Sequence, residues 1–254
     1  MRTGDKVNRY LVTTFDENYF LNFGISWFGS LFDISKFDGV VIAIVHDFKK
    51  QEVLNLLKEK KINIIIAPEE ASIVSKRTYA YFKIAELQRQ NKGLYAYYDF
   101  DGYFNGNIND VFDLYEPNKF LRTENNNDGF VCGDYQAWND YYDFLRFEKF
   151  CQFPLSTEYF FFGDNNIKWI DNKFNFVDIA RITPETEVKF IHYAGMIKKL
   201  LNTNYDYNFH FSKKHPEVCK KWTKIFNKKQ SHVKRKLISK NKDNHEKSDT
   251  DLGQ

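Results

Sequence analysis

The sequence predicts a single α/β domain with a central, mostly parallel β-sheet, followed by a basic helix and a disordered tail. Three observations support this fold class. Short apolar runs alternate with amphipathic segments, the links between them are brief, and no internal repeat interrupts the order. Such alternation is typical of β-α-β units, whose strands pair in parallel through right-handed crossovers. With 254 residues, 43% of them hydrophobic, the chain is long enough for one large core.

The first half of the chain is expected to hold the parallel part of the sheet. Strands are predicted at residues 10–15, 39–46, 62–67 and 94–98, and helices at residues 19–32, 47–59 and 73–90. The second strand is apolar on both faces, as in a parallel strand covered by helices on each side. Asp16 or Asn18 is a suitable N-cap for the first helix. Because neither a Gly-rich dinucleotide fingerprint nor a P-loop follows the first strand, those two nucleotide-binding classes are not expected.

The second half is less regular. Short strands are predicted at residues 108–114, 120–123, 130–132 and 188–193, and helices at residues 135–151 and from Ser156 or Thr157 to Phe162. We expect three regions along the chain: a domain at residues 1–202, a basic aromatic extension at residues 203–229 and a disordered tail at residues 230–254. The tail has few large apolar side chains, which is typical of disorder.

Composition points to a reducing compartment. The three cysteines, Cys132, Cys151 and Cys219, are odd in number and lack metal-binding spacing, so they are interpreted as free thiols. No signal peptide is visible, and no run approaches the roughly 20 apolar residues of a membrane span. The expected location is cytoplasmic, with peripheral contact at the inner face of an anionic membrane through the basic C-terminus as one option and a solvated end as the other. No nucleic-acid partner is expected.

The clearest chemical feature is the run Asp99-Phe100-Asp101-Gly102, which follows the strand at 94–98. Side chains alternate along an extended chain, so Asp99 and Asp101 are expected on the same side. Two adjacent carboxylates repel unless a positive charge lies between them, and a divalent cation is the usual partner. Gly102 is expected to permit a sharp turn. The same spacing recurs at Asp249 and Asp251 in the tail, so the strand context, not the motif alone, supports a metal site.

With these residues in view, the chain resembles a nucleotide-sugar glycosyltransferase of the GT-A (Rossmann-like) fold, closest in pattern to glycosyltransferase family 8. Four stretches carry the resemblance, in the family's order: Leu11–Tyr19, Asp99-Phe100-Asp101, Asn127-Asp128-Gly129 and His192-x-x-Gly195-x-x-Lys198. The resemblance spans roughly residues 10–200. It implies that the two aspartates and His192 hold Mn²⁺ or Mg²⁺, a mixed set that suits Mn²⁺ better because one ligand is an imidazole.

The resemblance also implies roles for other side chains. It implies contact with the nucleotide, diphosphate or donor sugar for Thr13, Thr14, Phe15, Asp16, Tyr19, Arg77, Phe100, Asn127, Gly195 and Lys198. The candidates for catalysis at the acceptor or donor sugar are Glu158, Asp164 and Asp128. Thr157-Glu158 stands where the family has Asp-Gln, so the stereochemical outcome stays open, with retention favoured over inversion. Trp138 and Trp169 are candidates for stacking on sugar rings, with core packing as the alternative.

The resulting hypothesis is a metal-dependent enzyme that moves a sugar from a nucleoside diphosphate, UDP being favoured, to a hydroxyl of a glycan acceptor. Such acceptors include surface polysaccharides, lipopolysaccharides and the glycans of glycoproteins. One alternative is a sugar-1-phosphate nucleotidyltransferase, which should carry a Gly-rich basic loop after its first strand. Thr13 to Asp16 contain no such loop. The other alternative is a non-catalytic nucleotide-binding or membrane-binding protein, which the intact motifs disfavour.

Overall fold

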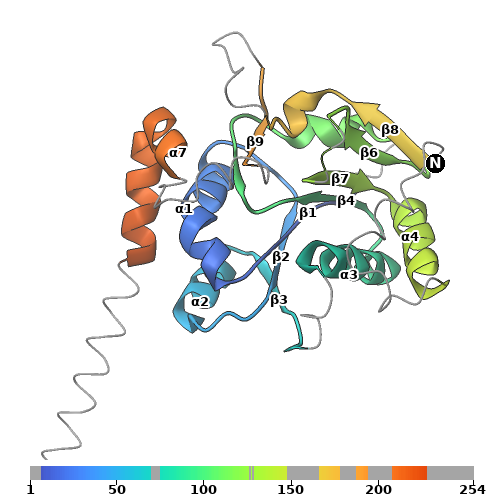
Figure 1. Ribbon diagram of the computed structural model, residues 1–254, viewed down its shortest axis with the longest axis horizontal. Coiled ribbons are helices and arrows are strands. Elements are labelled where there is room, and N and C mark those ends of the chain that lie inside the picture. The colour runs from blue at the N-terminus through green and yellow to red at the C-terminus, as the bar shows by residue number, and fades with distance from the viewer. Residues whose placement is uncertain are drawn as a thin grey trace, which may run out of the picture.

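The computed structural model describes residues 7–69, 75–125, 127, 129–147, 166–177, 187–193 and 208–227. A seven-stranded sheet of order β3-β2-β1-β4-β7-β6-β8 runs through the molecule, and a two-stranded sheet, β5-β9, lies beside it (Figure 1). The strands are β1 (Arg9–Phe15), β2 (Val40–Val45), β3 (Asn63–Ile66), β4 (Leu94–Tyr98), β5 (Gly102–Phe104), β6 (Phe120–Thr123), β7 (Phe130–Gly133), β8 (Ile167–Ile170) and β9 (Phe190–His192). The helices are α1 (Glu17–Asp33), α2 (Gln51–Glu59), α3 (Lys76–Gln90), α4 (Tyr135–Phe147) and α7 (Asn208–Lys214).

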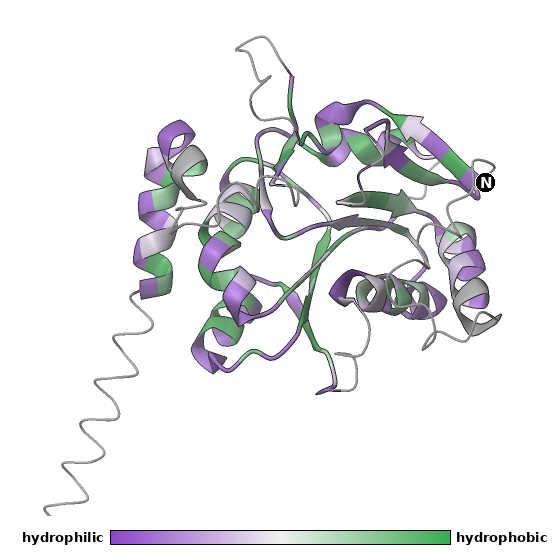
Figure 2. Cartoon of the chain, viewed as in Figure 1, coloured by the Kyte–Doolittle hydropathy of each residue, from purple (hydrophilic) through white to green (hydrophobic). Residues whose placement is uncertain are grey.

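The first half forms the parallel part of the sheet, as the sequence predicts. β1 pairs in parallel with both β2 and β4, and β2 pairs in parallel with β3. Asp16 is the N-cap of α1, because its carboxylate accepts a hydrogen bond from the Tyr19 N–H at 2.7 Å. Helices α1 and α2 cover one face of the sheet and α3 and α4 cover the other, so both faces of β2 are buried. Figure 2 shows the resulting hydrophobic band along β1 and β2.

The second half turns the sheet antiparallel and then parallel again. β7 runs antiparallel to both β4 and β6, whereas β8 at the edge is parallel to β6. The predicted strands at 120–123 and 130–132 are confirmed as β6 and β7. The predicted helix at 135–151 is described up to Phe147 as α4. The predicted helix from 156 to 162 and the tail at 230–254 lie outside the described residues.

The predicted strand at 108–114 is wrong. Residues Asn109–Leu114 form a 3₁₀ helix, which buries the adjacent side chains of Val111 and Phe112 together. In a strand, two neighbouring side chains would point to opposite faces. The Asn107 side chain starts the turn by accepting a hydrogen bond from the Asn109 N–H at 3.0 Å. Strand β5, which the sequence did not predict, pairs antiparallel with β9.

The basic C-terminal segment packs against α1. After α7, residues 216–227 are helical, and Figure 1 places this part of the chain beside α1. Trp222 is 1% exposed, stacks on Phe32 with ring centroids 5.2 Å apart, and donates from Nε1 to Asp33 at 2.9 Å. Phe226 packs edge-on against Phe20. None of the described helices combines the length and the apolar character needed to cross a bilayer. Cys132 is a buried free thiol, and Cys151 lies outside the described residues.

This packing predicts that Trp222 is a major source of stability. We expect Trp222→Ala to lower the free energy of unfolding by about 3–5 kcal/mol, because it removes a fully buried indole and leaves a cavity. The matched control is Trp169→Ala on β8, where the indole is 40% exposed and the loss should be clearly smaller. Urea denaturation followed by circular dichroism measures both. A loss of unfolding free energy in Trp222→Ala as small as that in Trp169→Ala would show that the C-terminal helix does not belong to the folded unit.

Candidate metal and nucleotide site

Asp99, Asp101 and His192 form a compact, buried cluster. The two aspartates follow β4 at its carboxyl end, and His192 is the last residue of β9. One ligand atom from each residue lies within 4.8 Å of the others. His192 Nε2 is 3.4 Å from Asp99 Oδ2 and 3.3 Å from Asp101 Oδ1. Two carboxylates and one imidazole, aimed at a common point and 2–8% exposed, are a donor set that fits a divalent transition-metal ion.

Strand pairing brings His192 to the aspartates. Gly102 of β5 is the register partner of His192, and the Tyr193 N–H donates to the Asp101 carbonyl at 2.7 Å. A Cβ atom at Gly102 would lie 2.4 Å from the Ile191 carbonyl oxygen, closer than real contacts allow. Gly102 does not adopt a left-handed φ, so its importance is the close approach of β9 rather than the sharp turn that the sequence suggested.

Asp99 is held by polar groups from several elements. Arg77, in the first turn of α3, forms an ion pair with it, and the Tyr97 hydroxyl donates to Asp99 Oδ1 at 2.7 Å. Trp27 of α1 donates from Nε1 to the Asp99 carbonyl at 3.1 Å, and the Gly129 carbonyl accepts from the Asp99 N–H at 2.8 Å. Sequence reasoning missed Tyr97 and Trp27. Tyr97 lies two residues before Asp99 on one strand, so alternation was a usable signal, whereas nothing local connects Trp27 to the site.

The electrostatics of the cluster favour a cation at its centre. Burial alone would raise the pKa of Asp99, but the positive charge of Arg77 and the nearby His192 outweigh it and hold that pKa well below its usual range. Burial alone would lower the pKa of His192, but the carboxylates of Asp101 and Asp99 raise it to about 9. A metal ion and the imidazole proton therefore compete for the same place between the carboxylates.

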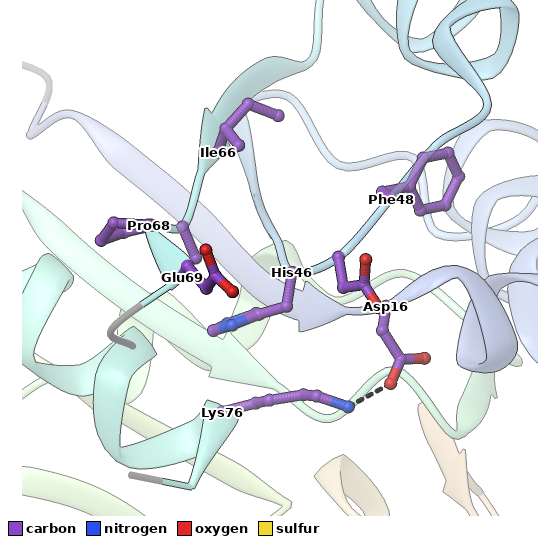
Figure 3. Close-up of a pocket in the computed structure, with 9 residues that line it drawn as sticks. Asp16, His46, Phe48, Ile66, Pro68, Glu69 and Lys76 are labelled. Carbon is purple, nitrogen blue, oxygen red and sulfur yellow. Dashed lines mark hydrogen bonds and ion pairs between the residues drawn. The ribbon is translucent and has the colours of Figure 1, made fainter. Parts of the chain in front are cut away.

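A pocket opens at the same edge of the sheet as the cluster, at the carboxyl ends of β1, β2 and β3. Its volume is about 740 Å³, and Figure 3 shows the side chains around it. The pocket is lined by Asp16, His46, Asp47, Phe48, Ile66, Ala67, Pro68, Glu69 and Lys76. Ligands of open α/β sheets bind at this edge of the sheet. The pocket therefore offers apolar walls and charged groups next to a candidate metal centre.

Asp16 and Lys76 of the pocket are paired with each other, and His46 is neutral near pH 7. Asp16 pairs with Lys76 from the start of α3. Burial raises the pKa of Asp16, but the Lys76 ammonium and the Tyr19 N–H outweigh it, so the pKa falls below its usual value. Burial and the charge of Lys76 lower the pKa of His46 to about 4, so its imidazole is neutral near pH 7. His46, Glu69 and Lys76 were missed in the sequence, although the strand-end rule could have singled out His46 after β2.

The other residues that the sequence singled out fall into three groups. One group is buried and comprises Thr13, Thr14, Phe15 and Phe100. The threonine hydroxyls donate to the carbonyls of Tyr98 and Ile44, and the two phenyl rings stack with centroids 4.3 Å apart. Tyr19 lies near the pocket, with the Lys76 ammonium 5.4 Å from the centre of its ring. Asn127 lies near the cluster, where its Oδ1 accepts a bond from the Gly129 N–H. The residues outside the described part of the chain are Asp128, Glu158, Asp164, Gly195 and Lys198.

The two tryptophans differ in exposure. Trp138 of α4 is fully buried, with Nε1 donating to the Tyr95 carbonyl at 3.3 Å, so core packing accounts for it. Trp169 of β8 is 40% exposed, and the Arg122 guanidinium lies 5.7 Å from its ring.

The architecture, with its mostly parallel seven-stranded sheet, is that of the GT-A fold, and several solved structures similar to it are glycosyltransferases. Apo GlyE from Streptococcus pneumoniae TIGR4 matches with a TM-score of 0.57 and 16% identity over 89% of this chain and 64% of GlyE. The bifunctional glycosyltransferase WbbM matches with a TM-score of 0.57 and 13% identity over 77% of this chain and 47% of WbbM. An active-site mutant of LgtC matches with a TM-score of 0.54 and 13% identity over 73% of this chain and 87% of LgtC.

These similarities define the fold class and no finer group. The chain spans less than two thirds of GlyE and about half of WbbM. No protein-family model matches the sequence. No curated protein matches it in sequence either. The predicted GT-A fold is therefore confirmed, while the predicted likeness to family 8 in particular stays a prediction.

The close approach of β9 to Gly102 predicts a sensitive position. We expect Gly102→Ala to destabilise the fold by about 1–3 kcal/mol, because the added methyl group meets a backbone carbonyl that cannot move independently of β9. Gly106→Ala is the matched control, since its nearest atom is Lys189 Cδ at 3.3 Å, near the end of a flexible side chain. Thermal unfolding of both variants measures the difference. A Gly102→Ala protein as stable as the control would contradict this explanation of Gly102.

Proposed function

We propose that this protein is a metal-dependent glycosyltransferase that transfers a sugar from a nucleoside diphosphate sugar to a hydroxyl group of a glycan. The observation that carries the proposal is the buried Asp99, Asp101 and His192 cluster next to a pocket of about 740 Å³ at the carboxyl edge of the sheet. The GT-A fold supports it, and one LgtC structure among its neighbours was solved with donor and acceptor sugar analogues. UDP is the favoured nucleotide and Mn²⁺ the favoured ion.

The residues of this chain have distinct tasks in this proposal. The pocket takes the nucleoside, with Phe48 and Ile66 as apolar walls and Asp16 and Lys76 as polar contacts. The cluster would hold the ion, which when bound would stabilise the charge that develops on the leaving diphosphate. Arg77, paired with Asp99 at the edge of the cluster, adds a fixed positive charge there. By the family resemblance, Gly195 gives the backbone room beside the diphosphate and Lys198 adds a further positive charge.

The acceptor is proposed to be a glycan that is presented at a membrane surface. The C-terminal helical segment carries several exposed lysines, which would attract an anionic membrane without inserting into it. These lysines are Lys213, Lys214, Lys220 and Lys224; the exposed Lys221 is paired with Asp33 of α1. The attraction is electrostatic, so it weakens as salt is added.

The first expectation is that nucleotide binding depends on the metal. UDP should bind in Mn²⁺ and bind much more weakly in EDTA, as measured by calorimetry. Asp101→Asn should weaken Mn²⁺-dependent binding by at least about 10–100-fold, since removing a direct ligand costs no less than removing its hydrogen-bond partner. The control is Asp140→Asn on α4, whose carboxylate only accepts a bond from Gln136.

Equal UDP affinity in Mn²⁺ and in EDTA would refute the metal-dependent proposal. Release of pyrophosphate from UTP and a sugar 1-phosphate would instead identify a nucleotidyltransferase.

The second expectation concerns the stereochemical route, for which we propose retention. In a retaining transfer the leaving diphosphate itself can take the proton of the acceptor hydroxyl, so Glu158→Gln should lower kcat only modestly. In an inverting transfer a side-chain base is needed, and the same change should lower kcat by about a hundredfold. Proton NMR of the anomeric product distinguishes the routes directly. An inverted product with an active Gln variant would exclude Glu158 as the base and leave Asp164 or Asp128.

A further inference from the structure

Asn175 is a fully buried amide close to the metal cluster. It follows the short 3₁₀ turn η4 (Asn172–Phe174) and is 0% exposed. Its Nδ2 donates to both the carbonyl oxygen and the Oδ1 of Asn127, each at 3.2 Å. The main-chain carbonyl of Asn175 accepts a bond from Asn125 Nδ2 at 2.7 Å, whereas its side-chain Oδ1 has no hydrogen-bond partner among the described residues. A buried amide that ties two remote segments together fixes one segment against the other, because leaving either partner unpaired is unfavourable.

The hydrogen bonds continue from Asn127 to the first metal ligand. Asn127 Oδ1 accepts from the Gly129 N–H at 2.9 Å, and the Gly129 carbonyl accepts from the Asp99 N–H at 2.8 Å. A chain of direct hydrogen bonds therefore runs from Asn175 through Asn127 and Gly129 to Asp99. A shift of Asn175 would therefore move Asn127 and Gly129 relative to Asp99.

Gly129 also lies directly against the imidazole of His192. A Cβ atom at Gly129 would lie 2.3 Å from both Cε1 and Nδ1 of the ring, so the glycine backbone closes off this side. In most metal sites the second ring nitrogen donates a hydrogen bond that fixes the ring. Among the described residues, His192 Nδ1 has no hydrogen-bond partner. Contact with the Gly129 backbone therefore takes the place of that bond in orienting Nε2 toward the carboxylates.

The residue after Asn175 fixes the backbone of His192. The Phe176 N–H donates to the Phe190 carbonyl, and the His192 N–H donates to the Phe176 carbonyl, both at 2.9 Å. The pair Asn175-Phe176 thus holds His192 from two sides: Phe176 through the main chain, and Asn175 through Asn127 and the Gly129 backbone beside the ring.

We propose that Asn175 is a positioning residue for the metal site: its amide fixes Asn127 and, through Asn127, the backbone of Gly129, which in turn keeps the His192 ring pointing at Asp99 and Asp101. Asn175 does not touch the ion or the substrates. This inference rests on the proposed function, since it assumes that the cluster binds a divalent ion.

The test compares two asparagines that make similar bonds in different places. Asn175→Leu keeps the number of side-chain heavy atoms but removes both donated bonds. Asn109→Leu is the matched control, because Asn109 Nδ2 donates to the Lys36 carbonyl at 2.7 Å and Oδ1 accepts from the Asp38 N–H at 3.3 Å, away from the cluster. Affinity for Mn²⁺ in the presence of UDP is measured by calorimetry and by Mn²⁺ electron paramagnetic resonance, below the melting temperature of each variant.

We expect Asn175→Leu to weaken Mn²⁺ binding by about tenfold or more and Asn109→Leu by less than about twofold. Activity of Asn175→Leu should recover at saturating Mn²⁺, as a purely structural defect would not. If Asn175→Leu does not fold, Asn175→Ser, which introduces less bulk, is measured against the same thresholds. If the variant at position 175 and Asn109→Leu bind Mn²⁺ with equal affinity, the positioning role of Asn175 is wrong, and the proposed function is unaffected. Failure of the unmodified protein to bind Mn²⁺ overturns both.

Discussion

Two carboxylates that share one buried site need positive charge beside them, and much of the surrounding structure meets that need. Leaving such a pair uncompensated inside a protein is strongly destabilising. Here Arg77 lies against Asp99, the His192 ring faces both carboxylates, and the Tyr97 hydroxyl donates to the same Asp99. These groups come from α3, β9 and β4, so the charge balance at one point ties three elements together.

The sheet divides the chemistry between its two halves. The parallel half provides the pocket, because the ends of β1, β2 and β3 lie side by side at one edge, and it provides Asp99 and Asp101 after β4. The second half contributes His192 and the Gly129 backbone, through strands that run in other directions. Because the site lies where the two halves meet, most strand residues need only pair regularly. The strict requirements fall on close-approach positions such as Gly102 and Gly129.

Local patterns in the sequence were enough to predict the parallel half. An apolar run marked β2 and runs rich in strand-forming residues marked β1 and β4, and alternation after β4 placed Asp99 and Asp101 on one side. The features that could not be predicted depend on contacts between distant residues. Strand β5 has only three residues and exists because it pairs with β9, so no window of sequence reveals it. The importance of Gly102 comes from the Ile191 carbonyl, and Asn175 in the run Lys-Phe-Asn-Phe resembles any turn asparagine until Asn127 is seen beside it.

The position of His192 in the chain has a consequence for biosynthesis. β9 follows all the strands of the main sheet in sequence, and β5 has no partner strand until β9 arrives. During translation the amino-terminal strands can pair as they leave the ribosome. A nascent chain that ends before residue 192 carries both aspartates but lacks the imidazole. The cluster of Asp99, Asp101 and His192 is thus completed only after the strands of the main sheet have been made.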